Sequence, residues 1–171
     1  VSRMASLEVV LEKADRTYSE EEKAELAERK NNYYLELLEH MDDSALLEGV
    51  KPVLEKLKDR KLLLAVGSAS KNAPAILEKT GLTPYLDKVS CGLDTTKSKP
   101  DPEVFLVAAK KLGLPPEECL VVEDSAAGIQ AAAAGNMKSL GVGPFYNALN
   151  ADYEAPALCK VTDAQWDAIL R

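Results

Sequence analysis

The sequence predicts an α/β fold built on a doubly wound parallel sheet. Short apolar runs of strand length recur at residues 61–67, 119–123 and 138–142, and segments with helical periodicity separate them. These runs are almost continuously apolar, as strands buried on both faces are in parallel sheets. Polar or charged residues follow directly after the first two runs, at the strand ends where ligands bind in open α/β sheets. Strands and helices that alternate at this length imply right-handed crossovers.

The first part of the chain, residues 1–45, is predicted to be a partial helical cap domain. Its first helix begins after Ser2, a candidate N-cap. Ser19 and Glu22 form the capping box of a second, longer helix. The apolar stripe of that helix is expected to contain Leu26, Tyr33, Tyr34, Leu37, Leu38 and Met41. Lys30 falls on the same stripe, where a lysine either buries its stem and keeps its charge in water or faces a ligand.

The remaining residues, 46–171, are predicted to form the α/β core. Asp101 is expected to be the N-cap of one core helix, with Pro102 at its first helical position. Trp166 is expected to pack in the core rather than contact a ligand. Strands are expected at residues 61–67, 88–91, 119–123, 138–142 and 157–159. Helices are expected at residues 50–57, 73–80, 102–112, 125–135 and 163–170.

Composition narrows the function classes. A net charge of −7 argues against a general nucleic-acid binder, which needs a basic face. No apolar run approaches the ~18 residues of a membrane span. Cys91, Cys119 and Cys159 lack metal-type spacing, so we expect reduced, hydrophobic cysteines. No signal-peptide pattern opens the chain, so a cytoplasmic location is expected. A monomer is the expected state.

Residues with phosphate and metal chemistry follow three of the predicted strands. Glu123 and Asp124 end one apolar run, and Mg²⁺ is often held by one or two carboxylates together with substrate phosphate. Ser68 and Ser70 follow an earlier run, where hydroxyls and backbone N–H groups suit phosphate. Lys99 follows a third strand. Each residue alone is more often a surface residue, but their joint occurrence at successive strand ends predicts a site for a phosphate and Mg²⁺.

Three stretches, residues 67–72, 97–102 and 122–129, resemble in order and spacing three motifs of the haloacid dehalogenase superfamily of phosphoryl-transfer enzymes. Within that superfamily the chain is most similar to the β-phosphoglucomutase family. This narrower similarity rests on residues 1–3, residues 29–31 and the Ser-Ala-Ser-Lys-Asn stretch that starts at Ser68. The resemblance extends over nearly the whole chain and implies a Rossmann-like core.

The resemblance also implies roles for residues of the core. Ser68 matches the hydroxyl that contacts the transferring phosphoryl group, and Ala69 matches a backbone N–H donor to the same group. Lys99 matches the cation that balances the charge, so Ser68 and Lys99 are the expected catalytic residues. Glu123 and Asp124 match the Mg²⁺ ligands of the superfamily.

Further residues match the substrate-binding positions of the family. Arg3 matches a cap arginine that binds the distal phosphate of a sugar bisphosphate. Ser70, Lys71 and Asn72 match core positions near that phosphate. Lys30 matches a cap lysine that faces the substrate. The expected partner is therefore a phosphorylated sugar.

One motif of the superfamily has no counterpart in these 171 residues. It is an Asp-x-Asp at the tip of the first strand, which supplies the aspartate nucleophile and the aspartate acid/base, and it would precede Val1. The resemblance therefore implies a core, residues 46–171, that lacks its first strand. A covalent aspartyl-phosphate mechanism needs its carboxylate, so the chain alone is expected to be inactive.

Three functions stay open at this point. The first is a Mg²⁺-dependent isomerase that interconverts β-glucose 1-phosphate and glucose 6-phosphate through the 1,6-bisphosphate. The second is a sugar-phosphate phosphatase of the same superfamily, in which water accepts the phosphoryl group. The third is a non-catalytic remnant that only binds phosphate and Mg²⁺. Arg3 and Lys30 favour the isomerase, because a second phosphate needs its own cations.

Overall fold

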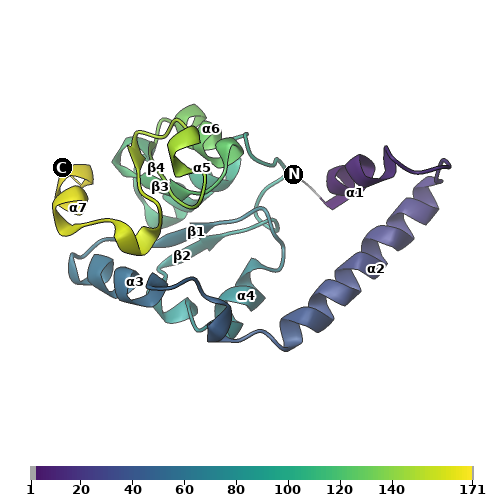
Figure 1. Ribbon diagram of the computed structural model, residues 1–171, viewed down its shortest axis with the longest axis horizontal. Coiled ribbons are helices and arrows are strands. Elements are labelled where there is room, and N and C mark those ends of the chain that lie inside the picture. The colour runs from purple at the N-terminus through teal and green to yellow at the C-terminus, as the bar shows by residue number, and fades with distance from the viewer. Residues whose placement is uncertain (1–2, 171) are drawn as a thin grey trace.

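Figure 1 shows the described part of the chain, residues 3–170 of a computed structural model. The helices are α1 (Arg3–Leu11), α2 (Glu20–Glu39), α3 (Val50–Asp59), α4 (Ala73–Lys79), α5 (Glu103–Leu112), α6 (Ala126–Ala134) and α7 (Asp163–Ile169). The strands are β1 (Ala65–Gly67), β2 (Lys88–Ser90), β3 (Leu120–Glu123), β4 (Lys138–Gly141) and β5 (Tyr153–Glu154). The N-cap expected at Ser2, and Val1 beside it, lie outside the described residues.

The predicted α/β fold with parallel strands is confirmed, and the strands form two sheets. β1 pairs with β2, and a second sheet has the order β3-β4-β5. Each strand pair is parallel, with Val66 opposite Val89 in the first sheet and Val121 opposite Ser139 in the second. Helix α4 connects β1 to β2 and α6 connects β3 to β4, as the crossovers of parallel pairs require, while a 3₁₀ turn at Tyr146–Ala148 lies between β4 and β5.

Two apolar clusters cover the sheets. The first consists of Val53, Leu57, Leu140, Ala155, Val161, Trp166 and Ile169, and the second of Val104, Phe105, Ala109, Val121, Ala131, Ala132 and Met137. In β3, Leu120 packs against the first cluster and Val121 belongs to the second. Because successive strand side chains point to opposite faces, α3 and α7 cover one face of β3 while α5 and α6 cover the other.

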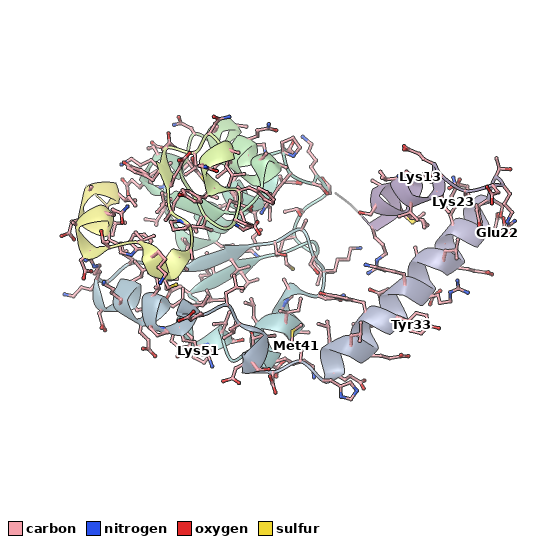
Figure 2. The ribbon with its side chains drawn as sticks, in the orientation of Figure 1. Lys13, Glu22, Lys23, Tyr33, Met41 and Lys51 are labelled. Atoms are coloured by element: carbon pink, nitrogen blue, oxygen red, sulfur yellow. The ribbon has the colours of Figure 1, made fainter. Side chains whose placement is uncertain are left out.

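Helix α2 has the predicted N-terminus but a different inward face. Ser19 Oγ accepts a hydrogen bond from the N–H of Glu22 (3.2 Å), and the Glu22 side chain accepts one from the N–H of Ser19 (2.8 Å), which confirms the capping box. The predicted stripe is wrong in part, because Leu37 is 71% exposed and Tyr33 projects from the helix into solvent (Figure 2). The predicted stripe residues Leu26, Tyr34, Leu38 and Met41 are protected, and Ala27 and Asn31 join them on that side.

This correction moves Lys30 off the inward face. Residues 27, 31, 34 and 38 follow one another at helical spacing, which places Asn31 on the protected stripe and leaves Lys30 exposed. Helix α1 buries none of its residues within the described part of the chain. The Lys23 ammonium pairs with Glu8 (2.9 Å) and joins α1 to α2.

Several boundaries in the core differ from the prediction, and β1 begins at Ala65 rather than at residue 61. The N-cap of α5 is Pro102 rather than Asp101, although the Asp101 side chain still accepts a hydrogen bond from the N–H of Glu103 (3.0 Å). The last strand lies at Tyr153–Glu154, and the residues expected as a strand form a 3₁₀ turn at Leu158–Lys160. Short apolar stretches do not distinguish a strand from a packed turn, because both bury the same side chains.

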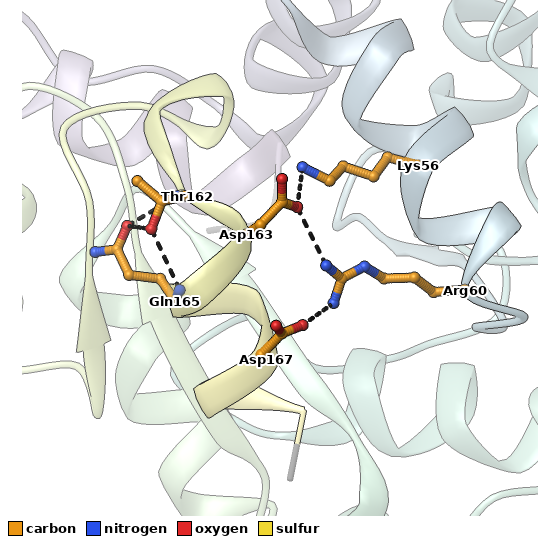
Figure 3. Close-up of polar contacts among 6 residues, drawn as sticks. All are labelled: Lys56, Arg60, Thr162, Asp163, Gln165 and Asp167. Atoms are coloured by element: carbon orange, nitrogen blue, oxygen red, sulfur yellow. Dashed lines mark hydrogen bonds and ion pairs between the residues drawn. The ribbon is translucent and has the colours of Figure 1, made fainter.

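Helix α7 is attached to α3 by ion pairs at its first turns (Figure 3). Arg60 pairs with Asp163 (3.1 Å) and Asp167 (2.7 Å), and Lys56 also pairs with Asp163. The Lys56 ammonium, assisted by Arg60, lowers the pKa of Asp163. Thr162 begins this helix with a second capping box. Such exposed pairs contribute little individually, so the buried indole of Trp166 is the main attachment of the helix.

Among residues 3–170, no helix is both long enough and apolar enough to span a membrane.

We expect Trp166→Ala to lower the free energy of unfolding by about 3–5 kcal/mol, because it removes a large side chain that is only 1% exposed. Trp166→Phe is the matched control. The indole N–H makes no hydrogen bond, so this variant should cost clearly less. Urea unfolding followed by circular dichroism measures both. Equal losses in the two variants would contradict the packing role.

Candidate active site

The loop after β1 is built from hydroxyl side chains that bond to the backbone. Ser68 extends the strand pairing, since its N–H donates to the carbonyl of Ser90 (2.9 Å). The Ser68 hydroxyl accepts from the N–H of Ser70 (3.2 Å), and the Ser70 hydroxyl accepts from the N–H of Asn72 (3.1 Å). Such local bonds favour turns over regular structure. They therefore place Ser68, Ser70 and Asn72 in one loop at the start of α4.

Glycines allow close packing around this loop. A Cβ on Gly67 would lie 2.7 Å from Cδ1 of Phe105, so the α5 ring packs directly against the end of β1. Gly92, after β2, donates its N–H to the carbonyl of Ser70 (3.2 Å), and a Cβ there would overlap the carbonyl oxygen of Ala69. The loop is therefore fixed from two sides, while Ala69 itself stays exposed.

Lys99, in the loop before α5, forms an ion pair with Glu123 at the end of β3. The two side chains are 18% and 9% exposed, and the Lys99 ammonium also lies 4.5 Å from the centroid of the Phe105 ring. The second oxygen of Glu123 accepts from the hydroxyl of Ser125 (2.9 Å). A carboxylate with so little exposure to solvent needs both partners, because the loss of Lys99 or Ser125 would leave its buried charge incompletely compensated.

Phe105 connects the two parts of the site. Its ring packs on Gly67, directly before Ser68, and lies beneath the ammonium of Lys99. The structure therefore brings the hydroxyl loop and the Lys99–Glu123 pair to the same side of α5. Sequence reasoning missed Phe105, because an apolar residue in a helix gives no sign of which side chain it supports.

The loop that carries Lys99 is held by Glu103. The Glu103 carboxylate accepts hydrogen bonds from the N–H groups of Thr96 (2.8 Å) and Lys97 (2.6 Å). These bonds, with that to Lys97 the strongest, lower the pKa of Glu103. Sequence reasoning also missed this role, although an acid in the first turn of a helix suggests one.

The two predicted Mg²⁺ ligands differ in their surroundings. Both oxygens of Glu123 bond to protein groups, whereas Asp124 is exposed and has no hydrogen bond or ion pair with the described residues. Mg²⁺ prefers oxygen ligands, so the carboxylates of Glu123 and Asp124 are suitable ligands for this ion. No cluster of three or more His, Cys, Asp or Glu occurs within residues 3–170, so water or phosphate would complete the coordination.

Asn31 joins the N-terminal helices to the hydroxyl loop. Its side-chain oxygen accepts from the guanidinium of Arg3 (2.6 Å) and lies 3.5 Å from the amide nitrogen of the Asn72 side chain. Two of the predicted substrate-binding residues, Arg3 and Asn72, therefore meet through a residue to which the sequence assigned no role. The helical spacing 27-31-34-38 is the signal that places Asn31 inward.

Two predicted site residues are not drawn into this arrangement. Lys30 is exposed, with its ammonium 5.3 Å from the centroid of the Tyr34 ring, and it makes no hydrogen bond with the described residues. Lys71 is also exposed. Within residues 3–170, neither lysine side chain makes a hydrogen bond or ion pair with Arg3, Asn31 or Asn72.

Comparisons with known proteins agree with these motifs. Residues 2–136 match the family of haloacid dehalogenase-like hydrolases. A β-phosphoglucomutase of Bacillus subtilis (strain 168) is 36% identical over 154 residues, which cover 89% of this chain and 68% of that protein. A crystal structure of β-phosphoglucomutase from Clostridium difficile has a TM-score of 0.88 at 34% identity, and the match covers 100% of this chain and 80% of that one.

Phosphatases also occur among the similar proteins. Fructose-1-phosphate phosphatase YqaB of Escherichia coli (strain K12) is 36% identical over 105 residues, covering 58% of this chain and 56% of that protein. A phosphorylated carbohydrates phosphatase of Thermotoga maritima is 30% identical over 138 residues, covering 80% of this chain and 59% of that protein. The chain thus spans little more than half the length of these two relatives.

We expect Asn31→Ala to loosen the connection between α2 and the hydroxyl loop. The variant removes the acceptor that Arg3 and Asn72 share, so the free energy of unfolding should fall by about 1 kcal/mol. Amide hydrogen exchange of residues 68–72 should become faster. Asn32→Ala is the matched control, because Asn32 is the exposed neighbour. Equal effects of the two variants would show that Asn31 does not link these elements.

The lowered pKa of Glu103 predicts a pH dependence. A depressed pKa stabilises the fold fully above the unfolded value of 4.5, and this contribution is lost as the pH falls through the folded value. Glu103→Gln should therefore lower the urea midpoint at about pH 6.5 and have little effect near about pH 3. Glu117→Gln, at an exposed site, is the control. A deficit in Glu103→Gln that is the same at both pH values would contradict a role for the ionised carboxylate.

Proposed function

Because this chain belongs to the family of haloacid dehalogenase-like hydrolases, we propose that it binds a phosphorylated sugar together with Mg²⁺ and serves phosphoryl transfer. The reaction we propose is that of a β-phosphoglucomutase, an isomerase that interconverts β-glucose 1-phosphate and glucose 6-phosphate through the 1,6-bisphosphate. The similar proteins from B. subtilis and C. difficile carry that name and support the choice.

The observation that carries this proposal is the contact of Arg3 with Asn31, which in turn adjoins Asn72. It places a guanidinium from α1 beside a core loop that also offers hydroxyls and an amide. A bisphosphate has two phosphates, and a guanidinium can bind one of them with two parallel hydrogen bonds. In this proposal Arg3 and Asn72 hold the phosphate that does not react, and Ser70 and Lys71 lie near it.

The transferring phosphoryl group is proposed to bind between Ser68 and Lys99. The Ser68 hydroxyl and the N–H of Ala69 would donate to its oxygens, and the Lys99 ammonium would offset its charge. Lys99 and Glu123 already form an ion pair. A bound phosphate would therefore share the Lys99 ammonium with Glu123, and Mg²⁺ would share the Glu123 carboxylate with Lys99. Mg²⁺, held by Asp124 and Glu123, would neutralise negative charge on the phosphoryl oxygens.

The sequence of 171 residues contains no Asp-x-Asp motif. Ser68 and Lys99 can position and neutralise a phosphoryl group, but an aspartyl-phosphate intermediate needs a carboxylate nucleophile. We therefore expect these residues by themselves to bind ligand without transferring phosphate. A coupled assay that detects glucose 6-phosphate formed from β-glucose 1-phosphate tests this. Turnover above about one per second, within the range of intact enzymes, would contradict it.

A sugar-phosphate phosphatase is the second candidate. Ala69 and Asp124 are exposed, so water can reach the loop and the carboxylate that face the proposed phosphate. A mutase must exclude that water from the reacting group, whereas a phosphatase uses it. The similar proteins from E. coli and T. maritima are phosphatases, which supports this alternative.

Ligand affinities can distinguish a chain with one phosphate-binding site from a chain with two. We expect glucose 1,6-bisphosphate to bind the chain in the presence of Mg²⁺ about tenfold more tightly than glucose 6-phosphate, because only the bisphosphate also engages Arg3. Arg3→Ala should abolish this preference in isothermal titration calorimetry. Arg16→Ala is the matched control, because its guanidinium pairs with Glu22 (2.8 Å). Equal affinities for both sugars in the unmodified chain would favour the phosphatase.

We also propose the domain division at residue 45, with α1 and α2 as a cap over the core of residues 46–171. A monomer in the cytoplasm remains the proposed state. With a net charge of −7, the proposed partner is the sugar phosphate rather than nucleic acid.

A further inference from the structure

The ammonium of Lys99 lies over the face of the Phe105 ring, 4.5 Å from its centroid. Arg16 and Lys30 also lie over aromatic rings, but both of these side chains are exposed. The Lys99 side chain is only 18% exposed. The attraction between a cation and a ring face grows when water is excluded, so the Lys99 contact is stronger than the other two.

The Phe105 ring is fixed by its packing. The side chain is 7% exposed and belongs to the apolar cluster that also contains Val121 and Met137. On the side of β1 it packs against Gly67, where even an added Cβ would come within 2.7 Å of the ring atom Cδ1. An interior packed this closely resists displacement, so the ring face is a fixed surface beside the proposed site.

Among residues 3–170, the Lys99 ammonium has two attractive contacts, the Glu123 carboxylate and the Phe105 ring. A metal ion would affect them differently. Glu123 is one of the proposed Mg²⁺ ligands, and a cation on that carboxylate competes with the ammonium and repels it. The ring offers no oxygen to a hard cation such as Mg²⁺, so its contact with Lys99 persists.

We propose that Phe105 is a positioning residue whose ring face holds the Lys99 ammonium in the site while Mg²⁺ occupies Glu123 and phosphate binds. The roles of Mg²⁺ and phosphate in this inference rest on the proposed function. The ammonium can turn from the carboxylate toward a phosphate oxygen while it remains over the ring. Without the ring, the flexible and strongly hydrated lysine would be drawn toward water. Phe105 thus acts through Lys99.

The first test needs no ligand. Glu123→Gln removes the carboxylate charge that holds the ammonium and leaves the ring in place. A ring face shifts the NMR signals of nearby protons upfield, so the Cε protons of Lys99 report whether the ammonium stays there. In a chain with ¹³C-labelled lysine, Lys99→Arg assigns this signal by its loss. Circular dichroism shows whether each variant folds.

We expect the upfield shift to persist in Glu123→Gln, because the ring still holds the ammonium. It should disappear in Phe105→Leu, which keeps an apolar side chain at this position without the ring. A Lys99 signal in Glu123→Gln at the position of exposed lysines would overturn the proposal. It would show that the ion pair alone positions the ammonium.

Fluorination of the ring separates its charge distribution from its packing. Replacing Phe105 by 3,4,5-trifluorophenylalanine nearly preserves the shape of the ring but withdraws negative charge from its face. In isothermal titration calorimetry with Mg²⁺ present, glucose 6-phosphate should bind this chain about fivefold more weakly. Replacement by 4-fluorophenylalanine should give an intermediate affinity, whereas a role in packing alone predicts no such gradation.

The same replacement at Phe145 is the matched control. This ring is 71% exposed, and no cation lies over it within the described residues. Equal affinities of the unmodified and trifluorinated chains, or equal losses at Phe105 and Phe145, would overturn the proposal. If the unmodified chain binds no glucose 6-phosphate with Mg²⁺, the proposed function fails, and the Lys99 signal still decides whether the ring holds the ammonium.

Discussion

The ion pair between Lys99 and Glu123 is the contact on which the rest of the site depends. It joins the loop before α5 to the end of β3, and the Glu123 side chain is only 9% exposed. A carboxylate so far from water is stable only with its partners in place. Ser125 holds its second oxygen, and Phe105 lies against the ammonium of Lys99. The same contacts that satisfy these charges also fix the two residues proposed to bind phosphate and Mg²⁺.

Helices and apolar side chains hold the two sheets of the core together. No backbone hydrogen bond connects the sheets within the described residues, so the connection is made by helices on both faces. Phe105 reaches from α5 to the end of β1 and shares a cluster with Val121 of β3. Apolar contact is not directional, so it holds the sheets near one another without setting a register between them.

The N-terminal helices meet the core through few polar contacts. Asn31 accepts from Arg3 and lies beside Asn72, while α1 buries none of its residues. Contacts of this kind are weak individually and exchange readily with solvent or a charged ligand. A phosphate that binds Arg3 and Asn72 would therefore replace an existing hydrogen-bonded link rather than occupy an unprepared surface.

The sequence by itself determined the parallel α/β class, the order of the helices and strands, the capping box at Ser19 and the placement of Ser68 and Glu123 at strand ends. These features depend on local periodicity and on residues a few positions apart. Lys30 was assigned to the inward stripe of α2, yet the protected polar residue is Asn31. A shift of one residue rotates a helical position by about 100°, and apolar residues on several sides of α2 left that rotation undefined. Only the tertiary structure decided that Asn31 meets Asn72, that Lys99 pairs with Glu123 and that the strands divide into two sheets. Each of these depends on which surfaces meet across more than twenty residues of chain, and local patterns carry no information about that.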